Sequence, residues 1–244
     1  MTTPAHTFNP RENHILAALS ADEFERLRPH MEQVELRRGA ILTHADEKIE
    51  HGYFPHHGII SAVAMMRDGS EVEVCLIGRE GTSAIPLFLG TDSLPIQTIV
   101  QVPDGATRIR ADILRAESER GGELQRLVLR YAQAFFVQAA QTAACNRLHK
   151  LDERLARWLL MCQDRMQSAE IELTHEVMAI MLGVRRAGVT EALGLLQRAG
   201  LVKIARGHVT ILDRAGLQQT ACECYGVISR EFARLDERSA QLVG

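Results

Sequence analysis

Two adjacent arginines, Arg185 and Arg186, stand where a short apolar segment gives way to a glycine turn and then a second segment. From residue 177 to residue 210 the chain has five Lys or Arg and a single acid, Glu191. Guanidinium groups bind phosphate and can read guanine edges through paired hydrogen bonds. The ordinary alternative is a solvated helix face, but this local excess of positive charge favours contact with nucleic acid. The basic side chains are Arg185, Arg186, Arg198, Lys203 and Arg206.

Residues 172–214 supply the elements that must position these arginines. Thr174 suits the N-cap of a first helix, and Gly183 can adopt the positive φ of a turn between crossed helices. A second helix is predicted to start near Arg185 and to end at Gly200. Its apolar positions follow a helical period and are Val189, Leu193 and Leu196.

Two strands are predicted after the second helix. Residues 201–205 and 208–212 are rich in Val and Ile, and the pair Arg206-Gly207 between them is typical of a hairpin turn. Helix, turn, helix and hairpin together predict a winged helix-turn-helix, whose second helix lies in the DNA major groove. The expected base-contacting residues are Arg186, Val189, Thr190 and Glu191. The expected phosphate-contacting residues are Thr174, His175, Arg185 and Arg206.

The charge of the chain is distributed unevenly. The 244 residues carry a net charge of −3, which does not by itself indicate a nucleic-acid-binding protein. Residues 1–149 hold 15 basic and 19 acidic side chains, whereas residues 150–244 hold 13 and 12. The basic character is therefore local to the C-terminal part.

Several classes of protein are not indicated. Residues 1–14 lack the apolar core of a signal peptide, no apolar run approaches a membrane span, and the five cysteines form no disulfide-like framework. We therefore expect a soluble cytoplasmic protein without a membrane partner. No phosphate-binding glycine loop, nucleophile elbow or zinc-protease motif is present, so we expect no enzyme.

The N-terminal part is predicted to be a β-roll. Short helices are expected within residues 13–29, and between residues 32 and 110 short alternating runs are separated by Gly or Asp turns. Such spacing predicts a sandwich or barrel. Residues 1–121 are assigned to this jelly-roll-like sensor domain, so that the fold class as a whole is α+β.

A long helix is predicted from about residue 123 to residue 149, which contains no Gly or Pro. Apolar or small residues recur along it in alternating steps of four and three, which is the spacing of a heptad seam. This spacing favours a helix that pairs with a second copy in a dimer. The alternative is a helix that packs on the barrel of its own chain. The seam residues are Val128, Tyr131, Phe135, Thr142 and Cys145. Residues 122–149 are thus the expected dimerisation helix, and residues 150–244 the DNA-binding domain with an additional C-terminal helix.

The order of these parts resembles the Crp/Fnr family of bacterial transcription regulators. The resemblance extends from about residue 13 to residue 212 and is most specific in AQTAACNRLHKLDERLARWLL and LGVRRAGVTEALGLLQRAGLV. It implies a β-roll that senses a small effector, a homodimer, a palindromic promoter site in double-stranded DNA, and RNA polymerase as a partner if the protein is an activator. Arg186 matches the base-reading Arg of the family, but Ala187 and Glu191 depart from common choices, so a different operator is expected.

The resemblance also indicates where an effector would bind. Members that bind cyclic AMP have an Arg followed by Ser or Thr at the positions of Ile96 and Gln97. Because an apolar side chain cannot neutralise a phosphate, cyclic AMP is not the expected effector, unless Arg79 replaces that Arg in a rebuilt loop. The effector therefore stays unidentified. The expected pocket residues are Gly81, Thr82, Ser83, Ile96 and Gln97.

No metal site or cofactor is predicted. No cysteine precedes Cys75, which argues against the iron-sulfur cluster of some relatives. Cys75 is expected to be a small buried residue and not a haem ligand, and His51, His56 and His57 are expected in an exposed loop. Cys222 and Cys224 do not face each other on a helix, and Cys145 in the seam leaves a redox role open. Two alternatives remain: a haem- or redox-sensing regulator, and a ligand- or partner-binding sensor that uses the winged helix for protein contacts.

Overall fold

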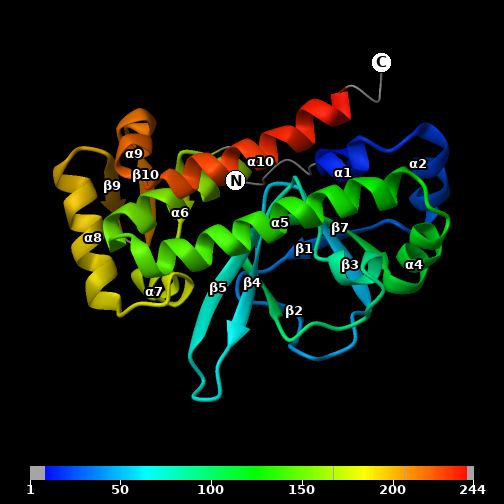
Figure 1. Cartoon of the computed structure of the whole chain (residues 1–244), viewed down its shortest axis with the longest axis horizontal. Helices are drawn as coiled ribbons and strands as arrows, with labels where there is room; N and C mark the ends of the chain where they lie inside the picture. The colour runs from blue at the N-terminus through cyan, green and yellow to red at the C-terminus, as the bar shows by residue number, and fades with distance from the viewer. Residues whose placement is uncertain (1–8, 167, 206, 241–244) are drawn as a thin grey trace, which may run out of the picture.

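The computed structural model describes residues 9–166, 168–205 and 207–240. A long helix, α5 (Glu123–Leu148), runs across the molecule, with the β-roll against one part of it and the helix-turn-helix at one end (Figure 1). The predicted fold class is confirmed: a β-rich N-terminal part, a long helix and a C-terminal helix-turn-helix. The helices of the N-terminal part are η1 (Pro10–Glu12), α1 (His14–Ala17), α2 (Ala21–Leu27), η2 (Arg28–His30), α3 (Ile85–Phe88) and α4 (Ala111–Glu119).

Two antiparallel sheets form the β-roll. One has the strand order β2-β6-β4-β5 and the other β1-β7-β3. The strands confirm the prediction of short strands between residues 32 and 110. Strand β3 has no alternating pattern in its sequence, HGYFP, because it includes Gly and Pro. The strands are β1 (Glu32–Leu36), β2 (Ile41–Thr43), β3 (His51–Pro55), β4 (Ile59–Met65), β5 (Glu71–Ile77), β6 (Gln97–Val102) and β7 (Asp104–Arg110).

The expectation that His51, His56 and His57 share an exposed loop is wrong. His51 belongs to β3, and His56, next to the end of that strand, is buried. Its Nε2 lies 3.0 Å from Thr107 Oγ1 and its Nδ1 lies 3.4 Å from Glu12 Oε2. Burial lowers the pKa of His56, which favours the neutral ring. His56 is therefore a structural side chain that joins two strands.

The predicted seam of α5 faces the interior of the same chain. Val128, Tyr131 and Cys145 are almost completely buried, and the partly buried Phe135 packs edge-on against Tyr131 with ring centroids 6.1 Å apart. The assignment of Val128, Tyr131 and Cys145 to a dimer interface is therefore wrong, whereas that of the half-buried Phe135 and Thr142 stays a prediction. Burial against one's own barrel and burial against a second copy produce the same spacing of apolar residues, so the pattern alone could not separate them.

A different stripe of α5 is exposed. Leu129 is 40% exposed and Phe136 is 68% exposed, although both are large apolar side chains. They lie on a second series of steps of four and three, displaced from the predicted seam. The exposed stripe consists of Leu129, Gln133, Phe136, Ala140, Ala143 and Arg147.

The C-terminal part contains a helix-turn-helix, a small sheet and two final helices. The small sheet has three strands in the order β8-β10-β9, one more than predicted, because the three residues of β8 are too few to give a recognisable pattern. The predicted final helix is divided at Ala221-Cys222. The elements are α6 (Leu151–Met166), β8 (Glu170–Glu172), α7 (His175–Leu182), α8 (Arg186–Arg198), β9 (Val202–Ala205), β10 (His208–Ile211), α9 (Arg214–Thr220) and α10 (Glu223–Ala240).

Buried polar contacts join the β-roll to α6. Trp158 Nε1 donates to Glu73 Oε1 at 2.8 Å, and Ser61 Oγ donates to the other oxygen at 2.6 Å. Arg165 Nη2 donates to Gln138 Oε1 at 2.7 Å, and Gln138 in turn donates to Leu76 O at 3.1 Å. Strand β5, helix α5 and helix α6 are thus connected by side chains without access to solvent.

No helix among the described residues is long and apolar enough to cross a membrane.

The Glu73 carboxyl group should make stability depend on pH. Burial raises its pKa from near 4.5 to about 7, so the folded chain keeps a proton that the unfolded chain releases between these values. The proton on Glu73 stabilises the folded chain fully at pH values below the pKa of this carboxyl in the unfolded chain. That stabilisation is lost as the pH rises through its pKa in the folded chain. In Glu73→Gln the amide can still accept from Trp158 and donate to Ser61, without carrying a charge.

We therefore expect the free energy of unfolding of the wild type to fall, relative to Glu73→Gln, by on the order of 1 kcal/mol per pH unit across this window. Urea unfolding at about pH 5 and about pH 8 measures the difference. Glu71→Gln, on the same strand, is the control. Parallel pH profiles for wild type and Glu73→Gln would contradict the expectation.

Candidate nucleic-acid interface

The first helix of the motif, α7, is fixed at both ends by local contacts. Val177 N donates to Thr174 Oγ1 at 3.3 Å, which makes Thr174 the predicted N-cap. At the other end Gly183 adopts φ 62° and ψ 43°, and the following amide, Val184 N, donates to Ala179 O at 2.9 Å. The turn that sets the angle between α7 and α8 thus requires a left-handed residue.

The second helix presents two different faces. Val189, Leu193 and Leu196 are fully or almost fully buried and hold α8 against the rest of the C-terminal part. Val189 has no exposed surface, so its assignment as a base contact is wrong: the same apolar period that identified the helix places this side chain in its core. The remaining candidates on α8, Thr190 and Glu191, are exposed.

Arg185 and Arg186 stand at the N-terminal end of α8. Arg185 is the N-cap, with extended backbone, and Arg186 is the first helical residue. The side chain of Arg186 is 70% exposed, and its Nε lies 3.8 Å from Glu176 Oε2. An exposed ion pair of this length contributes little to stability, so Arg186 can exchange its partner for a ligand at small cost.

His175 and Thr190 are brought together across the two helices. His175 Nδ1 lies 2.9 Å from Thr190 Oγ1, and that hydroxyl donates to Arg186 O at 3.1 Å. With the hydroxyl donating to Arg186 O, the contact is a hydrogen bond in the tautomer of His175 that carries its proton on Nδ1. From the sequence, His175 was expected to contact phosphate and Thr190 to contact bases. Their contact with each other could not be predicted from their spacing.

The wing contributes positive charge beside α8. Lys203 on β9 is exposed, and β9 pairs with β10 from Val202↔Ile211 to Ala205↔His208. Ile204 N donates to Gln197 Oε1 at 3.0 Å, which joins the wing to α8. Arg206, the predicted phosphate contact in the hairpin turn, lies outside the described residues.

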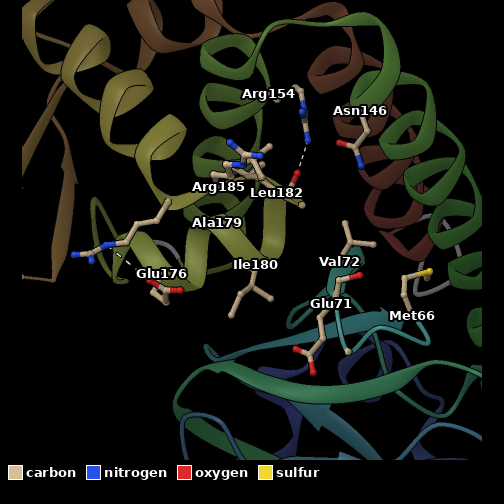
Figure 2. Close-up of a pocket in the computed structure, with 15 residues that line it drawn as sticks. Met66, Glu71, Val72, Asn146, Arg154, Glu176, Ala179, Ile180, Leu182 and Arg185 are labelled. Carbon is tan, nitrogen blue, oxygen red and sulfur yellow. Dashed lines mark hydrogen bonds and ion pairs between the residues drawn. The ribbon is translucent and has the colours of Figure 1, made fainter.

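A cleft of about 870 Å³ opens between the β4–β5 hairpin and the helix-turn-helix, which approach each other closely at Val72 and Gly183 (Figure 2). Ile180 of α7 points from one side toward the hairpin, and Val72 lies on the other. Arg154 donates to Leu182 O at the end of α7. The start of α8, with Arg185 and Arg186, forms one rim of this cleft.

The five candidate effector residues do not form an open pocket. Thr82, Ser83 and Gln97 are buried, and the hydroxyl of Thr82 donates to Tyr53 O at 3.0 Å. Gly81 lies so close to α5 that a Cβ there would come within 2.0 Å of the Tyr131 ring. Tyr131 thus packs against Gly81, and Thr82 is held by a hydrogen bond within the roll, while Ile96 is half-buried.

Comparison with known proteins assigns the C-terminal part. Residues 153–220 match the model of the Crp-like helix-turn-helix domain. The chain is 25% identical over 206 residues to the HTH-type transcriptional regulator Cmr of Mycobacterium tuberculosis (strain CDC 1551 / Oshkosh), covering 84% of this chain and 82% of Cmr.

Solved structures have the same fold. FixK2 from Bradyrhizobium japonicum superposes with a TM-score of 0.65 at 13% identity, covering 79% of this chain and 98% of FixK2. TTHB099, a CRP-family transcriptional regulator from Thermus thermophilus, superposes with a TM-score of 0.62 at 19% identity, covering 77% of this chain and 96% of TTHB099. At these identities the superpositions establish the fold.

The turn glycine provides a test of this geometry. Gly183→Ala forces a side chain into left-handed backbone, and its Cβ would approach Val72 Cγ2 to 3.0 Å. We expect a loss of about 1–2 kcal/mol in the free energy of unfolding. Gly194→Ala, in the interior of α8, should be neutral or stabilising by up to about 1 kcal/mol. Thermal unfolding measures both, and equal midpoints for the two variants would refute the role of the turn.

Proposed function

We propose that the chain, which carries a Crp-like helix-turn-helix domain on the fold of solved CRP-family regulators, is a Crp/Fnr-type transcription regulator that acts as a homodimer on a palindromic promoter site. The observation that carries the proposal is the division of α8: one face is buried, and the other leaves Arg186, Thr190 and Glu191 exposed. These three residues are the proposed base contacts. The proposed phosphate contacts are Thr174, His175, Arg185 and Arg206.

Positive charge supports this use of the surface. Arg185 and Arg186 stand at the N-terminus of α8, where unpaired backbone amides also favour anions. Binding dominated by phosphate contacts should weaken steeply as salt increases. A winged helix used for protein contacts would not show that dependence, so a salt titration separates the two functions.

The exposed stripe of α5 is the proposed dimer contact. A helix-turn-helix protein reads two half-sites as a two-fold dimer, and this stripe offers apolar side chains at heptad spacing. The β-roll is the proposed sensor, with an effector that is not cyclic AMP, since Ile96 cannot neutralise a phosphate. If the protein is an activator, RNA polymerase is its further partner.

The stripe can be tested by one substitution. Phe136→Glu would place a charge at a contact between two apolar helices, so we expect a monomer that does not bind its palindrome. Light scattering measures the mass. Leu89→Glu, at a side chain 62% exposed in the β-roll, is the matched control and should leave the mass unchanged. A dimer that survives Phe136→Glu would exclude this stripe.

The register of α8 can be tested with the two arginines. Arg186→Ala should weaken binding and relax preference at one base pair in each half-site, because a bidentate contact to guanine supplies about 1–3 kcal/mol of discrimination. Arg185→Ala should weaken binding evenly and flatten the salt slope by roughly one unit. Selection from randomised half-sites measures both. If Arg185→Ala changes base preference and Arg186→Ala does not, the two roles are reversed.

A further inference from the structure

Four side chains of metal-ligating type, from distant parts of the chain, converge where α5 ends and α10 begins. Cys145 lies in the last turn of α5, His149 ends that helix, and Cys222 and Cys224 stand at the start of α10. Their ligand atoms all lie within 4.8 Å of one another. Cys145 Sγ is 3.4 Å from Cys222 Sγ, and Cys224 Sγ is 3.6 Å from His149 Nδ1.

These distances suit a single tetrahedral ion. Bonds of about 2.3 Å to sulfur and about 2.0 Å to nitrogen put the ligand atoms of a site with three sulfurs and one nitrogen about 3.5–3.8 Å apart. The separations of 3.4 and 3.6 Å found here are close to these values. Three thiolates and one imidazole are an established ligand set for structural zinc. An iron-sulfur cluster distributes its ligands over more than one iron, which spreads them further than the 4.8 Å within which all four of these ligand atoms lie.

The surroundings also suit a metal. All three cysteines are buried, with Cys145 completely so. His149 Nε2 lies 3.2 Å from Glu223 Oε2, which leaves Nδ1 directed at the sulfurs. A carboxylate on the far nitrogen is the usual device that orients a metal-binding histidine.

A buried positive charge lies beside the cluster. The guanidinium of Arg157 is close enough to Cys145 to interact with its sulfur. Three thiolates and one divalent cation leave a net negative charge, which a buried arginine offsets.

We propose that Cys145, His149, Cys222 and Cys224 bind one Zn²⁺ ion, in a site that ties the end of α5 to the start of α10. The ion would fix the connection between the helix that leads out of the β-roll and the last helix of the chain, on either side of the helix-turn-helix in sequence (Figure 1). This inference goes beyond the proposed function, and metal binding can be measured without DNA.

The test uses the full chain, reduced, stripped with a chelator and titrated with Co²⁺ and then with Zn²⁺. We expect one equivalent of Co²⁺ per protomer, with the intense visible absorption of a tetrahedral thiolate site, and its displacement by Zn²⁺. Cys224→Ser and His149→Gln should each weaken binding at least tenfold, and Glu223→Gln by about 10–100-fold. Cys75→Ala, which removes a buried thiol outside the cluster, is the matched control and should bind like the wild type.

Circular dichroism of each variant shows whether it has folded, and Glu223→Gln, at a carboxylate 78% exposed, changes no ligand and no core side chain. Failure of the folded wild type to take up Co²⁺, or equal uptake by wild type and Cys224→Ser, would overturn the proposal. Loss of two thiols on mild oxidation, in a chain that binds no metal, would also overturn it and indicate a Cys145–Cys222 disulfide instead. Loss of DNA binding by Arg186→Ala has no bearing on these outcomes.

Discussion

The buried positive charge of Arg165 must be compensated, and the arrangement of the β-roll and the C-terminal part depends on this requirement. The side chain is 5% exposed, and an unpaired guanidinium in such a place costs several kcal/mol. Its Nε lies 2.8 Å from Glu80 Oε1 in the β-roll, and its Nη2 donates to Gln138 on α5. The guanidinium also lies over the Phe232 ring of α10, 4.9 Å from its centroid. Four parts of the chain must therefore be in place together before this charge is compensated.

The N-terminus of α5 also has polar groups that need partners from another part of the chain. Its first amides have no partner within the helix, and Glu23 of α2 supplies both carboxylate oxygens, accepting from Glu123 N at 2.6 Å and Leu124 N at 2.9 Å. Gly122 permits this approach, because a Cβ there would come within 1.9 Å of Glu23 Oε1. The long helix is thus anchored to the N-terminal helices at one end and to α6 through Gln138 further along.

The sequence was most informative where structure is determined locally. Thr174, Gly183 and the period of Val189 depend on neighbours a few residues away, so the helix-turn-helix could be predicted closely. The face that α5 turns inward depends on surfaces distant in sequence, and the seam through Tyr131 was therefore assigned to the wrong contact. The convergence of Cys145 with Cys222 could not be anticipated either, since 77 positions separate them and no spacing rule relates them.

Trp158 has a consequence for how the molecule can be observed. It is the single tryptophan of the chain, it is 2% exposed, and its indole N–H is bonded to Glu73 across the junction of β-roll and α6. Around it, Ile59 and Leu76 of the roll share one apolar core with Leu155 and Leu159 of α6. Any motion that parts the two halves would bring water to the indole and shift its fluorescence emission to longer wavelength. The protein thus contains an intrinsic optical reporter of its own domain movement.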